Sequence, residues 1–120
     1  KWLGLAVSRK RLATSHAATV TRELATLVTV GITLAEAIDT LASQHRGRMR
    51  RSLLVMQQSV LAGVSFAESM QQVPELFEDV DVSIARMGEG SGDLGLALHE
   101  IADFKEAAGQ FQDKVFTALM

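Results

Sequence analysis

The chain has 120 residues, which is enough for one domain and too few for a catalytic domain beside a regulatory one. Apolar residues make up 48% and cysteine is absent, which argues against disorder and excludes disulfides and thiolate metal sites. The net charge is −2, and it is unevenly distributed along the chain. Residues 1–60 carry nine Lys and Arg and three Asp and Glu, whereas residues 61–120 carry three Lys and Arg and eleven Asp and Glu. This uneven distribution favours oriented contacts with partners.

The apolar residues recur with a 3.6-residue period, and the alternation typical of strands is missing, so the sequence predicts an all-α fold. Residues 1–13 are predicted to be a linker or an added extension, and residues 14–120 to be the domain. The first helix is expected to begin at Thr14 or Ser15, whose hydroxyls would cap it, and to end at Gly31.

A repeat organises the middle of the chain. Residues 31–38 read Gly-Ile-Thr-Leu-Ala-Glu-Ala-Ile, and residues 63–70 read Gly-Val-Ser-Phe-Ala-Glu-Ser-Met. In each copy the glycine is predicted to end a helix, the hydroxyl two residues on to cap the next, and the glutamate to complete a capping box. The repeat therefore predicts helical hairpins. The residues in these roles are Gly31, Thr33 and Glu36, then Gly63, Ser65 and Glu68.

Between the two copies a helix is predicted from about Gly47 to Gly63. Its first turns carry an arginine cluster that opposes the helix dipole, comprising Arg46, Arg48, Arg50 and Arg51. A solvated face is the ordinary interpretation, and the alternative is contact with an acidic partner or anionic lipid headgroups. DNA binding is disfavoured, because no helix combines basic residues with base-reading polar side chains.

The next short helix must end just before Pro74. A fifth helix is expected to carry acids at its start and to end at Gly88. Residues 88–94, Gly-Glu-Gly-Ser-Gly-Asp-Leu, then predict a turn with Ser91 as a cap and Asp93 in the first helical turn. The last helix is predicted to carry one long apolar stripe. The stripe comprises Leu94, Leu98, Ile101, Ala108, Phe111, Val115 and Ala118.

Glu89, Ser91 and Asp93 form the most distinctive polar group, and three glycines flank them. The ordinary interpretation is a tight helix–helix turn. The functional alternatives are a partner contact, or a weak calcium site made by Glu89 and Asp93 at a subunit interface. No other cofactor is expected. The turn glycines are Gly88, Gly90 and Gly92.

No pattern for catalysis is present in the sequence. The histidines His16, His45 and His99 lie in different predicted elements and lack zinc-ligand spacing. Residues 88–92 lack the preceding strand that a phosphate-binding loop or a serine nucleophile elbow requires. The sequence therefore predicts that the chain is not an enzyme.

The combined motifs resemble the type II secretion F family. They are Gly-x-[Thr/Ser]-Leu-x-x-Ala-Ile, Ala-Gly-x-Ser-[Phe/Leu]-x-x-[Ser/Ala]-Met, a Pro-x-[Leu/Phe]-Phe step and Gly-Glu-x-Ser-Gly-x-Leu, and they span about residues 18–120. The resemblance implies a six-helix antiparallel bundle, which the predicted hairpins would build. It also implies a place on the cytoplasmic face of the bacterial inner membrane, in a parent protein that spans the membrane. We expect this chain to be a piece of that parent, because it begins at Lys1 and stops inside a helical run.

The resemblance further implies a platform of type II secretion or type IV pilus biogenesis. Such a platform contacts a cytoplasmic assembly ATPase and couples its motion to the extraction of pilin or pseudopilin. Other inner-membrane assembly proteins and a second copy of the chain are expected partners, and nucleic acid is not. The arginine cluster, Glu89, Ser91 and Asp93 are the predicted contacts. The alternative is a stand-alone helical adaptor or regulator that binds an acidic partner or nucleic acid through the arginine cluster.

Overall fold

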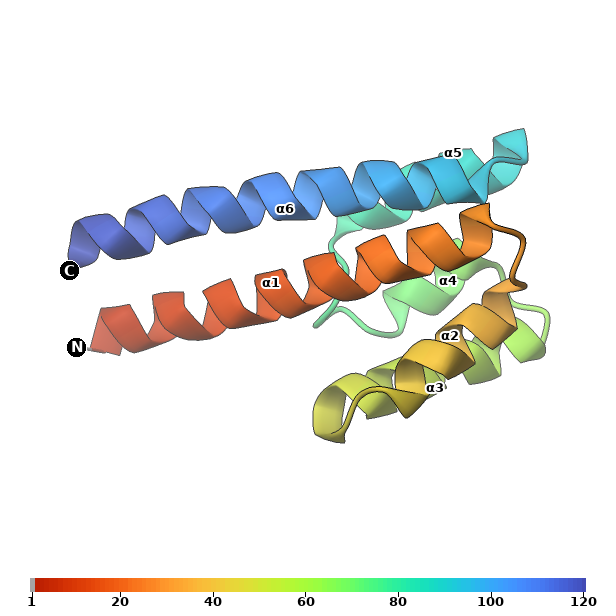
Figure 1. The fold of residues 1–120 in the computed structure, drawn as a ribbon, viewed down its shortest axis with the longest axis horizontal. Helices are drawn as coiled ribbons and strands as arrows, with labels where there is room; N and C mark the ends of the chain where they lie inside the picture. The colour runs from red at the N-terminus through yellow and green to blue at the C-terminus, as the bar shows by residue number, and fades with distance from the viewer. Residues whose placement is uncertain (1) are drawn as a thin grey trace.

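The computed structural model describes the backbone of residues 2–120 and the side chains from residue 16 onward. This part of the chain forms six helices and no strand, which confirms the all-α class and the predicted number of helices. They are α1 (Trp2–Thr29), α2 (Leu34–Ser43), α3 (Gly47–Leu61), α4 (Phe66–Gln71), α5 (Asp79–Ser91) and α6 (Leu94–Leu119). Each helix packs against the next along the chain, and α1 packs against α6, so the contacts close into a ring (Figure 1).

One apolar core fills this ring, and all six helices contribute to it. Burying each large apolar side chain contributes about 1.5–3 kcal/mol to folding, so the core accounts for the cohesion of the short helices α2 to α4, which would be unstable alone. Its largest buried side chains include Leu24, Ile38, Leu41, Leu53, Met56, Phe66, Met70, Leu98 and Ile101.

The glycine of each repeat ends a helix, as predicted. Gly31 and Gly63 have φ angles of 102° and 89°, which residues with a Cβ atom rarely adopt. The amide after each glycine donates to a carbonyl five residues earlier, at 3.0 Å in both copies. This bond ties the chain back to a carbonyl of the last helical turn, and in the second copy that carbonyl also accepts the amide hydrogen of Ala62.

The hydroxyl of each repeat caps the next helix, also as predicted. The side-chain oxygens of Thr33 and Ser65 accept the amide hydrogens of Glu36 and Glu68, at 3.3 and 3.1 Å. The carboxylates of these two glutamates return no bond to the cap residues. Both capping boxes are therefore half formed, because both glutamates are exposed and their carboxylates are free to be solvated instead.

The predicted start of the first helix is wrong. The helix α1 runs without a break from Trp2, so Thr14 and Ser15 lie inside it. A hydroxyl residue inside a helix costs only a few tenths of a kcal/mol relative to the best helix formers, so it permits a start without imposing one. Residues 2–13 are thus helical and continuous with the rest of α1.

The predicted end of the fifth helix is also wrong. The helix α5 continues through Gly88 and Gly90 as far as Ser91, and the turn is confined to Gly92 and Asp93. Gly92 has a φ of 79° and is the glycine that ends the helix. A glycine inside a helix costs about 1 kcal/mol relative to alanine, which packing against α6 can offset.

The helix α6 is as long as predicted, but its apolar stripe is buried only in part. Its buried residues lie between Gly95 and Lys105. Phe111 is 68% exposed and Val115 is 37% exposed, so the second half of the stripe faces solvent. Within residues 2–120, no helix is both long enough and apolar enough to cross a bilayer.

Candidate functional site

Glu89 lies between two helices of the fold. Its carboxylate accepts the amide hydrogens of Phe66 and Ala67, at 2.7 and 3.0 Å, one on each oxygen. These amides begin α4, where backbone donors lack helical partners and the helix dipole favours negative charge. Glu89 therefore fastens α5 to α4, and both of its oxygens are already engaged. Glu89 was predicted to contact a partner or to bind calcium, and in the structure it binds another helix of the same chain.

Ser91 and Asp93 lie at the surface beside the turn. The Ser91 hydroxyl donates to the carbonyl of Gly88 at 3.3 Å, within its own helix. Asp93 is the cap of α6, and its Oδ1 accepts the amide hydrogen of Leu96 at 3.1 Å. The predicted cap role of Ser91 thus belongs to Asp93, because α5 extends through Ser91.

No three His, Asp or Glu side chains in the described part of the chain are grouped so as to hold a metal ion. The calcium site suggested for Glu89 and Asp93 gains no support from an arrangement in which Glu89 is engaged with α4. Calcium binding there stays a prediction, which a calorimetric titration of the chain with calcium would test.

The arginine cluster lies on the first turns of α3, and all four side chains are exposed. Arg46 occupies the cap position without a capping hydrogen bond from its side chain. None of the four forms an ion pair with the residues that the structure describes. In Figure 1 the start of α3 lies at the bottom of the view, below α1, and the turn between α5 and α6 lies at its upper right. The structure therefore separates the arginine cluster from Asp93.

A groove that the sequence did not reveal lies beside the arginine cluster. It has a volume of about 360 Å³, between α3 and the connection from α4 to α5, and we call it the α3 groove. A second hollow of about 190 Å³ adjoins it and shares three lining residues with it, Arg48, Ser52 and Glu75. The α3 groove is lined by Arg48, Arg51, Ser52, Val55, Gln72, Val73 and Glu75.

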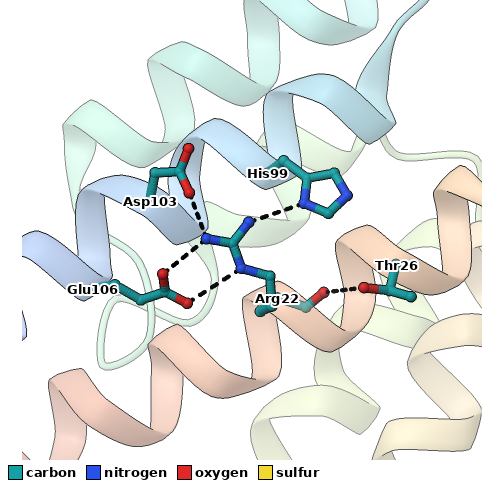
Figure 2. A network of polar contacts seen from close by, with 5 residues as sticks. All are labelled: Arg22, Thr26, His99, Asp103 and Glu106. Atoms are coloured by element: carbon teal, nitrogen blue, oxygen red, sulfur yellow. Dashed lines mark hydrogen bonds and ion pairs between the residues drawn. The ribbon is translucent and has the colours of Figure 1, made fainter.

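Arg22 joins α1 to α6, as Figure 2 shows. Its Nη2 and Nε donate to the two carboxylate oxygens of Glu106, at 2.8 and 3.2 Å, and Nη2 also contacts Asp103. The hydrogen bonds to Glu106 and then to Asp103 raise the pKa of Arg22 above its ordinary value. The planar guanidinium thus forms a bidentate clamp between the two longest helices.

His99 completes this network on α6. Its Nδ1 lies 3.0 Å from Nη1 of Arg22 (Figure 2). Because a guanidinium only donates hydrogen bonds, Nδ1 must accept, and the imidazole proton then sits on Nε2. His99 is therefore a structural partner of Arg22 on α6.

Asp81 and Lys105 form an ion pair inside the fold. Their Oδ2 and Nζ atoms are 3.0 Å apart, and both side chains are buried. The amide of Glu78 also donates to Oδ2 at 2.8 Å, and Nζ lies 5.4 Å from the ring centroid of Phe77. Oδ1 of Asp81 has no hydrogen-bond partner. The pair connects α5 to α6 at the point where the buried half of α6 ends.

Sequence reasoning missed the contacts of Arg22 with α6, of Lys105 with Asp81 and of Glu89 with α4, although one of them left a signal in the sequence. Lys105 falls four residues after Ile101, within the apolar stripe of α6, and a charge in an apolar stripe indicates a buried partner. No such signal marks Arg22 or Glu89. Their partners lie 84 and 23 residues away, so only the packing of whole helices brings them together.

Comparison with known proteins gives consistent matches. Residues 20–120 match the family described as type II secretion system (T2SS), protein F. The type II secretion system protein F of Aeromonas hydrophila is 33% identical over 113 residues, which cover 93% of this chain and 29% of the relative. The protein of the same name from Pseudomonas aeruginosa is 36% identical over 104 residues, with 86% and 26% covered.

A pilus protein also matches. The type IV pilus assembly protein PilC of Myxococcus xanthus is 29% identical over 100 residues, which cover 82% of this chain and 24% of the relative. The chain thus spans less than a third of the length of each of these three relatives.

Proposed function

The chain belongs to the type II secretion system protein F family, and from that premise we propose that it is a non-enzymatic docking domain of an inner-membrane platform. Relatives named for type II secretion and for type IV pilus assembly support a role in one of these two kinds of machine. In this proposal the domain lies on the cytoplasmic face, receives an assembly ATPase, and couples its motion to the movement of pilin or pseudopilin. Its six helices would act as one antiparallel bundle of hairpins.

The observation that carries this proposal is how the fold uses its ionisable groups. Within residues 16–120, Asp81 pairs with Lys105, Glu89 binds the start of α4, and Arg22 binds α6. These interior and interhelical charges therefore stabilise the fold. The arginine cluster, by contrast, is exposed and has no acidic partner there, which fits a surface that meets another protein.

A binding assay with the cognate assembly ATPase tests this proposal. Replacing the four arginines of the cluster by glutamate should reduce binding at least about tenfold, because each pair with the partner changes from attraction to repulsion. Arg86→Glu is the matched control, since Arg86 is exposed on α5, away from the cluster. Unchanged circular dichroism would show that the variants fold. Full binding by the cluster variant would refute the assigned surface.

The predicted contact at Asp93 can be tested without removing its cap. Asn is as good a helix cap as Asp, so Asp93→Asn should leave α6 intact and remove only the charge. Weaker ATPase binding by this variant would support a contact at the turn. Binding equal to that of the unmodified chain would assign Asp93 a purely structural role.

A nucleic-acid adaptor is the second candidate, because the unpaired arginine cluster would also suit phosphates. Its affinity for duplex DNA or RNA would fall steeply with salt, whereas a docking surface that includes apolar contacts would show a shallower dependence. Fluorescence anisotropy with labelled duplexes at several salt concentrations separates the two candidates.

A further inference from the structure

The α3 groove joins an apolar surface to a positively charged one. Val73 lines the groove and is buried beneath it. Val55, in the middle of α3, also lines the groove and is 43% exposed. Arg48 and Arg51 line the same groove, and both are exposed and unpaired within the described residues. The groove therefore has an apolar wall with two cations beside it.

Glu75 gives the groove a fixed acceptor. Its carboxylate accepts a hydrogen bond from the hydroxyl of Ser52, which is buried on α3. This bond holds the connection between α4 and α5 against α3, and Glu75 still lines the groove. A carboxylate held in this way can accept further hydrogen bonds from a backbone amide of a bound chain.

We propose that the α3 groove binds a peptide segment of a partner protein in which an acidic side chain stands next to a large apolar one. The apolar side chain lies against Val55 and Val73, and the acidic one pairs with Arg48 and Arg51. The volume of about 360 Å³ falls at the low end of the roughly 300–1,000 Å³ of ligand pockets, which suits one or two side chains. This inference rests on the proposed docking function and names the chemistry of its partner.

The charges around the groove favour a peptide over a membrane. Glu75 lines the groove beside Arg48 and Arg51, so the groove carries both signs of charge. An anionic bilayer presents one sign of charge everywhere and would be repelled by the carboxylate of Glu75. A peptide can place its carboxylate at the arginines and its amides at Glu75, so it satisfies both signs of charge.

Selection from a random 12-residue peptide phage library on the immobilised chain tests the inference. The selected peptides should be enriched in Asp or Glu beside Leu, Ile or Phe. Val55→Asn and Arg51→Ala should each weaken binding of a selected, fluorescein-labelled peptide about tenfold, as loss of an anchor residue does. The matched controls are Leu61→Asn on the same helix and Arg86→Ala on α5, because both side chains are exposed outside the groove.

Several outcomes would overturn the inference. They are a library without enrichment, equal losses in groove and control variants, and selected peptides that bind Val55→Asn normally. Vesicles of phosphatidylglycerol provide the membrane arm: binding to them that needs Arg51, with no enriched peptide, would also overturn it. Circular dichroism confirms that each variant folds.

The outcome of this experiment is separable from that of the ATPase assay. If the arginine-cluster variant loses ATPase binding and the library yields no groove peptide, the docking function stands and the inference fails. If groove peptides are selected and the ATPase does not bind, the groove is a peptide site and the assigned partner is wrong.

Discussion

Gly88 and Gly90 stand two residues apart in α5, yet only one of them has a close neighbour. A Cβ on Gly88 would lie 2.3 Å from Cβ of Ala97, whereas nothing lies within 4 Å of that position on Gly90. The absence of a side chain at Gly88 therefore allows the close approach of α5 and α6.

Alanine at these two positions should have opposite effects. Gly88→Ala is expected to lower the free energy of unfolding by about 1–3 kcal/mol, because the added methyl group overpacks the contact with α6. Gly90→Ala should raise it by about 0.5–1 kcal/mol, because alanine is the better helix former in an exposed position. Urea unfolding followed by circular dichroism measures both. Equal effects would contradict the close approach.

The cap formed by Glu89 makes a second prediction at this scale. Glu89→Gln keeps the shape, but glutamine has one acceptor oxygen for the two amides and turns a donor NH2 group toward the other amide, so we expect a loss of about 1–3 kcal/mol in the free energy of unfolding. Amide hydrogen exchange at Phe66 and Ala67 should accelerate. Glu100→Gln on the exposed face of α6 is the control. Unaltered exchange at the two amides would show that the cap contributes little.

The contact between α5 and α6 depends on a buried charge pair. Lys105→Met should lower the free energy of unfolding by about 3–5 kcal/mol, because it leaves Asp81 buried and unpaired. Adding Asp81→Asn should restore much of that loss, since the asparagine is neutral and can still accept the Glu78 amide hydrogen. Thermal unfolding of both single variants and the double variant measures this coupling. Strictly additive effects would mean that the pair is not coupled.

Features that arise within a few residues could be predicted from the sequence. The turns at Gly31 and Gly63 and the caps at Thr33 and Ser65 depend on hydrogen bonds that span three to five residues, so the local sequence holds both partners of each bond. The end of α5 could not be predicted in this way. Gly88 ends a helix by local preference, but the proximity of Ala97 in another helix makes the helical form favourable there.

The candidate site was harder to predict from the sequence than the helices. The exposed arginine cluster was correctly identified as a patch of charge, because charge is visible in the sequence. The α3 groove was not, since Val55, Gln72 and Glu75 become neighbours only when the connection after α4 folds against α3. Glu89 looked like a surface acid because its partner is a pair of backbone amides, which have no sequence signature.

Across the whole molecule, stability should be unevenly distributed along α6. Its buried residues end at Lys105, and no side chain in residues 106–120 is buried. Amides in residues 110–118 should therefore exchange through local opening with little urea dependence, while those in residues 98–105 exchange only through global unfolding. Native-state hydrogen exchange in increasing urea measures this. A common urea dependence along all of α6 would contradict it.

The first turns of α1 and the last turns of α6 lie together at one end of the molecule (Figure 1). A mechanical load that draws both ends in the same direction would move the domain as a single body, with the helix pair carrying tension along its length. A load that separates the two ends would instead peel α6 from α1 one turn at a time, and would reach the clamp at Arg22 only after the exposed turns had parted. The direction of the applied force, more than its magnitude, would then decide whether the domain stays folded.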